Sequence, residues 1–370
     1  MADRLIAEGK IDLVALGRQA FCDVNFPRKV IEGRSWDINR CARCMSCMGG
    51  GSPPSRKGEN AAQPPEMSPE AMLDMLIDGT GPVRVAQCPV SPERDFVWPE
   101  EGFPEVGTSK KVLVAGGGVG GIQAAISASE RGHSVTLAEK TVHLGGIMRY
   151  TETDDFKYDL RNHLHLMLRR LGDSGTKLLL NTEANEELIR DEAPDVIIAA
   201  VGSVPKRSDL PGAERAIDVL DMYGGAYVGS STIICGAGES GCEAAVYLAA
   251  KGVNVTLISR SPTIMRNSGG GFRSIMEEQL GKYGVTLMTD TAVTEFTEDG
   301  VSIVGQDGKT VGLQADSVIL ALGMSANTEA LDELKKAAGD IPVIAVGDCV
   351  EARKMCSAVG EAMQAAYSIV

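Results

Sequence analysis

Two stretches of the chain repeat one pattern, and this repeat constrains the fold more than any other feature. In each copy, a short apolar strand leads into a glycine-rich turn, an alanine-rich helix and a second strand. The four strands span 112–115, 135–138, 232–235 and 255–258. A unit of this kind, about 30 residues long, is the β-α-β motif of dinucleotide-binding folds. The sequence therefore predicts an α/β protein with two related, Rossmann-like halves.

Two further apolar strands, 195–202 and 316–323, resemble each other and follow the two copies. Because the chain runs on well past the second copy, we expect the first half to be interrupted by the second. This assigns 108–206 and 315–370 to one dinucleotide-binding domain and 207–314 to the other.

The first forty residues suggest a helix, a strand at 12–16 and another helix. A single strand with two helices cannot close a core. The segment 1–40 must therefore dock on later parts of this chain or on another polypeptide. Residues 41–107 form a separate segment, which contains clustered cysteines and a Pro- and Gly-rich stretch at 49–66. A short helix is expected between Ser68 and Gly79, because serine is a favoured N-cap and glycine a frequent helix end.

The first glycine turn has the spacing G-x-G-x-x-G at Gly116, Gly118 and Gly121. The first glycine allows a tight turn, the second lets a pyrophosphate approach the backbone, and the third lets helix and strand pack closely. Glu139 follows Gly121 by 18 residues, at the end of the next strand, where a carboxylate can accept a hydrogen bond from a ribose hydroxyl. These residues predict a dinucleotide site, and a glycine turn without a ligand is the alternative.

The second turn repeats the spacing at Gly236, Gly238 and Gly241. The position equivalent to Glu139 is Ser259, and Arg260 follows it. A serine and a guanidinium suit a 2′-phosphate better than a carboxylate does, which favours NADPH over NADH. If Arg260 is only a solvated surface residue, the nucleotide is NADH.

Three cysteines occur at C-x2-C-x2-C spacing, and a fourth, which precedes a proline, follows after a gap of 40 residues. The four are Cys41, Cys44, Cys47 and Cys88. Bacterial ferredoxins bind [4Fe–4S] clusters with a similar compact run and a Cys-Pro pair. Zinc sites more often use two separated C-x2-C pairs. The pattern therefore favours an iron–sulfur cluster over zinc or unliganded thiols.

Composition excludes several classes of function. The formal net charge of −14 argues against non-specific nucleic-acid binding, which depends on basic surfaces. No run of 18 apolar residues occurs, so no membrane-spanning helix is expected. The first ten residues lack the apolar core of a signal peptide, and we therefore expect a cytoplasmic protein.

The order of these features is more specific than any one of them. A Leu-Gly-Arg triplet at 16–18 precedes Asn-Arg-Cys-x2-Cys-x2-Cys, then Cys-Pro-Val-Ser-Pro at 88–92, then two nested dinucleotide halves. This order resembles the C-terminal portion of the multidomain relatives of old yellow enzyme. Those relatives include 2,4-dienoyl-CoA reductase, trimethylamine dehydrogenase and the clostridial enoate and bile-acid or steroid ene-reductases. The resemblance covers essentially the whole chain, although its 40-residue gap before Cys88 is longer than is usual in the family.

The resemblance implies a TIM barrel with FMN, a [4Fe–4S] cluster on the four cysteines, and FAD and NAD(P)H domains. Gly17 and Arg18 match the end of the last barrel strand, where the arginine meets the FMN phosphate. Gly347 and Asp348 match a Gly-Asp pair that approaches the ribityl and phosphate region of FAD. Only the last β-α portion of the barrel is present, so we expect residues 1–40 to complete a barrel that a partner chain supplies.

The resemblance further implies an enzyme, an electron-input flavoprotein that carries electrons from NAD(P)H through FAD and the cluster to the partner's FMN. There an unsaturated small molecule would be reduced at an activated C=C bond. The catalytic acid is expected on the barrel, so no catalytic residue is assigned here. Three alternatives remain: a scaffold that holds ADP, as in trimethylamine dehydrogenase, an NAD(P)H:acceptor oxidoreductase without a barrel, and a zinc-stabilised interaction protein.

Overall fold

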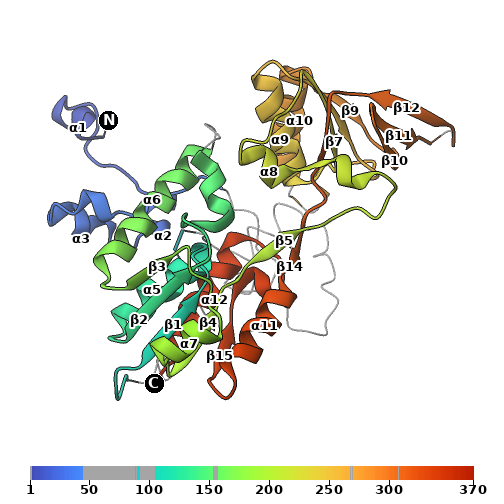
Figure 1. Cartoon of the computed structure of the whole chain (residues 1–370). Coiled ribbons are helices and arrows are strands. Elements are labelled where there is room, and N and C mark those ends of the chain that lie inside the picture. The colour runs from blue at the N-terminus through green and yellow to red at the C-terminus, as the bar shows by residue number, and fades with distance from the viewer. Residues whose placement is uncertain are drawn as a thin grey trace, which may run out of the picture.

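The computed structural model describes residues 2–44, 88, 90–91, 105–152, 157–266, 268, 270–306 and 308–370. These residues form an N-terminal helical segment and two lobes, each built on a five-stranded parallel sheet (Figure 1). The helix expected between Ser68 and Gly79 lies outside the described residues.

The sheet of the first lobe has the strand order β15-β4-β1-β2-β3. Its strands are β1 Lys111–Ala115, β2 Ser134–Glu139, β3 Lys177–Leu180, β4 Val196–Ala199 and β15 Val343–Ala345. Its helices are α5 Val119–Glu130, η3 Gly146–Glu152, α6 Tyr158–Asp173, α7 Glu186–Glu192, α11 Thr328–Ala338, η6 Gly347–Cys349 and α12 Met355–Tyr367.

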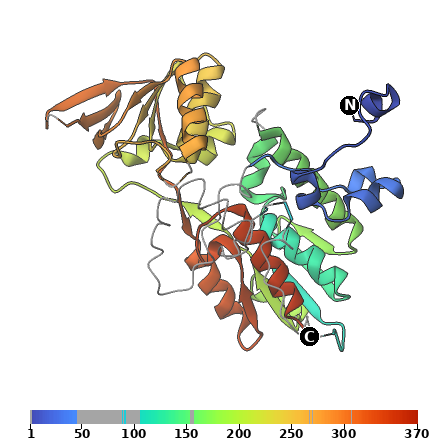
Figure 2. The ribbon, with the colours of Figure 1, turned by 180° about the vertical axis from the view of Figure 1, so that it is seen from behind.

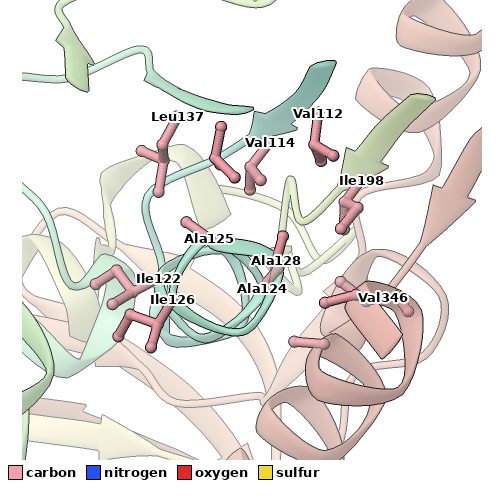
Figure 3. Close-up of a cluster of buried hydrophobic side chains, with 14 of the residues drawn as sticks. Val112, Val114, Ile122, Ala124, Ala125, Ile126, Ala128, Leu137, Ile198 and Val346 are labelled. Atoms are coloured by element: carbon pink, nitrogen blue, oxygen red, sulfur yellow. The ribbon is translucent and has the colours of Figure 1, made fainter. Parts of the chain in front are cut away.

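Burial on both faces explains why β1 is apolar at nearly every position. Val112 and Val114 pack against α5 and α12 on one face (Figure 3). Leu113 and Ala115 belong to a second buried cluster on the other face. Successive side chains of a strand point to opposite faces, so a central parallel strand covered on both sides needs a continuous apolar run.

The second lobe repeats this sheet in the order β6-β13-β7-β8-β9. Its strands are β6 Ile217–Asp218, β7 Ser231–Cys235, β8 Asn254–Ile258, β9 Thr286–Met288 and β13 Ser317–Leu320. Its helices are η5 Ala213–Arg215, α8 Val219–Tyr223, α9 Glu239–Ala250 and α10 Gly270–Lys282. An antiparallel sheet contributes Phe296 to the buried cluster of Ile233 and Cys235, and consists of β10 Ala292–Thr297, β11 Gly300–Val304 and β12 Thr310–Gln314.

The predicted nesting of two related halves is confirmed. Each glycine-turn strand, β1 or β7, has its own parallel neighbours in equivalent places, and β15 returns to the first sheet after the whole second lobe. The expected resumption of the first half at residue 315 is wrong, because β13 pairs with β7 and buries Ile319 in the second lobe. The chain leaves the first lobe through β5 Ser203–Pro205 and returns through β14 Met324–Ala326, and these two strands pair (Figure 1).

The N-terminal segment departs from its expected secondary structure. It contains α1 Ala2–Ala7, α2 Arg18–Cys22, α3 Phe26–Ile31 and η1 Ser35–Asp37. Residues 12–16 form no strand, and the side chain of Leu13 is 88% exposed. A strand needs a neighbour for its backbone hydrogen bonds, and no described strand lies beside this stretch.

The rest of this segment docks on α6 of the first lobe. Arg170 of α6 donates to the Asp37 carboxylate and carbonyl oxygens at 2.9 Å each, and Asp159 accepts from Arg43 at 2.6 Å. A buried ion pair between Lys29 and Asp23, 2.9 Å long, fixes the segment internally. The segment lies on the side of the first lobe away from the second lobe (Figure 2).

Candidate functional site

Both glycine turns lie at the carboxyl ends of central parallel strands, where α/β proteins bind ligands. Gly116 has a φ of +107°, and a Cβ there would lie 2.4 Å from the Ala200 carbonyl oxygen. A Cβ on Gly121 would lie 1.8 Å from the Gly116 carbonyl oxygen. Only glycine therefore fits the turn and the contact between α5 and β1.

The second turn has the same geometry. Gly236 has a φ of +112°, and a Cβ there would lie 2.4 Å from the Ala321 carbonyl oxygen. A Cβ on Gly241 would lie 1.8 Å from the Gly236 carbonyl oxygen. The same two glycine positions are therefore sterically required in both turns, which lie on separate sheets.

The middle glycine of each turn faces open space. A Cβ on Gly118 would meet only the Gly146 Cα, at 3.9 Å, and one on Gly238 would meet nothing within 4 Å. These residues are the N-caps of α5 and α9, and neither helix start receives a side-chain cap. Free N–H groups beside an open backbone suit an anionic pyrophosphate, so the residues fit a dinucleotide.

The structure brings Glu139 to the first glycine turn. Its carboxylate accepts hydrogen bonds from the backbone N–H of Gly117 at 2.7 Å and of Thr141 at 2.8 Å. Gly145 and Gly146, which were not singled out from the sequence, lie against the same turn. The Gly145 N–H donates to the Gly117 carbonyl at 2.8 Å, and both glycines have positive φ. The Leu-Gly-Gly sequence after Glu139 could have indicated this close approach.

Gly347 and Asp348 lie just after β15, at the same edge of the first sheet. The Asp348 carboxylate accepts from the Ser203 hydroxyl at 3.1 Å and from the Arg353 backbone N–H at 3.0 Å. Gly347 has a φ of +70°, and its N–H donates to Glu361 at 2.8 Å. Asp348 also lines the large cavity described next.

A cavity of about 1100 Å³ extends from the second glycine turn to the first lobe. The second lobe contributes Gly236, Glu239 and Ser259 among other residues, and the first lobe contributes Asp348 and Lys354. Both dinucleotide-binding halves therefore border one space.

The predicted phosphate-binding pair lies in this cavity. Ser259 is buried and its hydroxyl accepts from the Ser261 N–H at 3.1 Å, whereas Arg260 is exposed. Three further arginines, Arg207, Arg266 and Arg353, line the same cavity and were not singled out from the sequence. Arg260 and Arg266 both line this cavity and add positive charge to its lining.

Glu239, at the start of α9, is held by two contacts. The Ser268 hydroxyl donates to its carboxylate at 2.6 Å, and Lys354 of the first lobe lies 3.1 Å away. Burial raises the pKa of this carboxyl, but the hydroxyl and the lysine outweigh it, so the pKa of Glu239 is lowered. Glu239 is therefore ionised beside the second glycine turn.

Of the four cysteines predicted to bind a cluster, the structure brings Cys41 and Cys88 together. Cys88 is buried with Cys22 and Val90, and Cys41 packs against them. The Sγ atoms of Cys88 and Cys22 are 3.5 Å apart, and this contact, then burial, raises the pKa of the Cys22 thiol. Cys44 is exposed and Cys47 lies outside the described residues. The described part of the chain holds no group of three or more His, Cys, Asp or Glu residues suited to a metal ion.

Cys22 was not expected in this thiol group, because it lies on α2, 19 residues before Cys41. Gln19 of the same helix donates to the Asn39 carbonyl at 2.7 Å and accepts from the Cys41 N–H at 3.3 Å. Gly17 and Arg18, the proposed FMN contacts, are exposed at the start of α2.

Among the described helices, none is long and apolar enough to cross a membrane.

Comparisons with known proteins agree with this geometry. Residues 110–361 match the family model described as pyridine nucleotide-disulphide oxidoreductase. The chain is 33% identical over 380 residues to an NADH oxidase of Thermoanaerobacter brockii, covering 100% of this chain and 53% of that protein. It is 27% identical over 374 residues to a cinnamate reductase of Clostridium sporogenes, covering 98% of this chain and 50% of that protein.

Among solved structures, 2-naphthoyl-CoA reductase in complex with 2-naphthoyl-CoA superposes with a TM-score of 0.81 and 28% identity. The match covers 100% of this chain and 52% of that one. The chain thus spans about half the length of the curated relatives it matches.

Proposed function

Since the chain belongs to the pyridine nucleotide-disulphide oxidoreductase family, we propose that it is the electron-input part of an NAD(P)H-dependent ene-reductase. In this role it delivers electrons from NAD(P)H, by way of FAD and a [4Fe–4S] cluster, to FMN in a partner TIM barrel. The main support is the single cavity bordered by the second glycine turn and by Asp348 and Lys354 of the first lobe. Two nucleotide sites that share a space suit hydride transfer between their ligands.

The first lobe is the proposed FAD site. Gly116, Gly118 and Gly121 would bind the pyrophosphate, and Glu139 would bind the ribose hydroxyls with a carboxylate already oriented by two backbone N–H groups. Gly347 and Asp348 would contact the ribityl and phosphate region. When bound, FAD accepts a hydride and can release electrons singly.

The second lobe is the proposed NADPH site. Gly236, Gly238 and Gly241 would bind the pyrophosphate. Ser259 and Arg260 would hold a 2′-phosphate, and Arg266 adds a second guanidinium to the lining of the same cavity. The second lobe has Ser259 rather than a carboxylate at the position equivalent to Glu139, and a carboxylate there would repel a 2′-phosphate. NADPH is therefore the proposed donor in preference to NADH.

The proposed cluster ligands are Cys41, Cys44, Cys47 and Cys88. Their thiol chemistry suits iron, and the apolar surroundings of Cys41 and Cys88 suit a group that is kept from solvent. Iron and acid-labile sulfide in chain purified without oxygen test this assignment. Cys44→Ser should lose both, whereas Cys242→Ala, which changes a buried core thiol of the second lobe, should retain them. Bound zinc, or equal iron in both variants, would contradict the assignment.

The proposed barrel partner would cover the exposed apolar residues of the N-terminal segment. Leu13 is 88% exposed, Ile31 85% and Val24 64%. Exposed apolar groups clustered on one segment mark an interaction surface, and the chain spans only half of its relatives. Gly17 and Arg18 on this segment would reach the FMN phosphate, which TIM barrels bind at their last strands.

One experiment separates this function from its alternatives: cofactor analysis of the chain purified anaerobically together with its associated proteins. We expect FAD, iron, sulfide and a co-purifying FMN barrel. ADP without a flavin spectrum would instead indicate a nucleotide scaffold. FAD with NADPH-dependent reduction of ferricyanide, but no barrel, would indicate an NAD(P)H:acceptor oxidoreductase.

A further inference from the structure

Two ion pairs join the lobes at the first turns of α9. Lys354 Nζ lies 3.1 Å from Glu239 Oε1, and Lys157 Nζ lies 2.6 Å from Glu243 Oε2. In both pairs the cation belongs to the first lobe, at the N-cap of α12 or α6, and the carboxylate belongs to α9 of the second lobe. These two ion pairs connect the lobes in addition to the paired strands β5 and β14.

The two pairs differ in their surroundings. The side chains of Lys157 and Glu243 are each 21% exposed, and Lys157 does not line the cavity. The side chains of Lys354 and Glu239 are 69% and 42% exposed, and both line it. An exposed pair of this kind contributes little stability, so it can be exchanged at small cost.

Glu239 occupies a position that a bound dinucleotide also needs. It is the first residue of α9, directly after the open Gly238, and the N-terminus of this helix is where a pyrophosphate binds. Two anions at one helix end repel each other unless a cation compensates. Arg353, the other first-lobe cation in the cavity, pairs with Glu361 of its own lobe, whereas Lys354 already lies beside Glu239 at the start of α9 and is therefore the better candidate.

We infer that Lys354 exchanges partners, pairing with Glu239 in the nucleotide-free chain and with the pyrophosphate of the nicotinamide dinucleotide in the complex. The inference rests on the proposed function of the second lobe and adds to it. Lys354 is then a nucleotide-binding residue that the FAD-binding lobe supplies, and Glu239 is the internal anion that competes with the ligand.

Equilibrium titration of the FAD-loaded chain with ADP-ribose tests this exchange, because ADP-ribose has the pyrophosphate but no nicotinamide. Lys354→Gln should weaken binding by roughly two- to fivefold, the size of one partly exposed charge contact. Glu239→Gln should strengthen binding by a similar factor, and a gain in affinity cannot come from misfolding. Added salt should weaken binding less in Lys354→Gln than in the unaltered chain.

Lys157→Gln is the matched control, because it breaks the other ion pair between the lobes without removing a cavity cation. It should bind ADP-ribose as the unaltered chain does. Equal weakening by Lys157→Gln and Lys354→Gln would show that lobe placement matters rather than contact with the pyrophosphate, and would overturn the inference. Unchanged or weaker binding by Glu239→Gln would also overturn it. If the unaltered chain fails to bind ADP-ribose, the proposed nucleotide site itself is refuted, and the exchange with it.

Discussion

Replacement of Gly121 by alanine tests whether the contact between α5 and β1 controls the first nucleotide site. A Cβ at this position would lie 1.8 Å from the Gly116 carbonyl oxygen, whereas real Cβ atoms keep more than about 3.0 Å from such atoms. The helix must therefore move by about 1.2 Å relative to the glycine turn. Overpacking of this kind costs about 1–3 kcal/mol.

Gly120→Ala is the matched control on the next residue of the same helix. Its Cβ would meet the Ala358 carbonyl oxygen at 3.5 Å and the Ala358 Cβ at 3.7 Å, which are ordinary contacts. Both substitutions gain about 1 kcal/mol of helix propensity, so the difference between the two variants isolates the clash. We expect Gly121→Ala to unfold about 1–3 kcal/mol more easily than Gly120→Ala.

The assay combines denaturant unfolding of both variants with the amount of FAD retained per chain after gel filtration. Gly121→Ala should lose FAD, because the displaced helix start no longer presents its N–H groups to the pyrophosphate, while Gly120→Ala should retain it. If the two variants show equal stability and equal FAD content, the steric argument for this turn is incorrect.

Three further outcomes are expected. Burial lowers the pKa of His163 to about 3. Because this folded pKa lies below the unfolded value of about 6.5, the contribution of His163 to stability is complete above about pH 6.5 and falls by about 1.4 kcal/mol per pH unit from there down to about pH 3. Calorimetry should find this slope reduced in His163→Leu. Arg170→Met removes both hydrogen bonds to Asp37 and should speed amide exchange in residues 18–43 by at least about tenfold, since the loss of even one charged hydrogen bond has an effect of that size. Unchanged exchange would mean that other contacts hold the segment. Arg260→Gln should weaken NADPH binding by about tenfold and leave NADH binding unchanged, and an equal loss for both nucleotides would argue against a 2′-phosphate contact.

The local sequence was enough to predict most of the two parallel sheets. The apolar strands β1 and β7, the glycine turns and the following helices depend on local chain geometry, because only glycine permits a φ near +110° and the close helix contact. The resemblance between β4 and β13 was also visible in the sequence, but only the structure shows that they occupy equivalent places beside β1 and β7.

Contacts between distant segments were beyond the reach of the sequence. A stretch such as 12–16 has the composition of a strand, but a strand forms only where a neighbour supplies hydrogen bonds. The boundary at 315 was misplaced because burial of Ile319 against β7, rather than chain order, decides which sheet β13 joins.

The same division applies to the candidate sites. The sequence by itself was enough to select the glycine turns, Glu139, Ser259 and Arg260 as candidate nucleotide-binding residues, because their spacing is fixed within one β-α-β unit. Only the tertiary structure placed Lys354 beside Glu239 and Cys22 beside Cys88, because these pairs join segments 115 and 66 residues apart. Packing of the two lobes and of the N-terminal segment brings them together, and no local pattern encodes that packing.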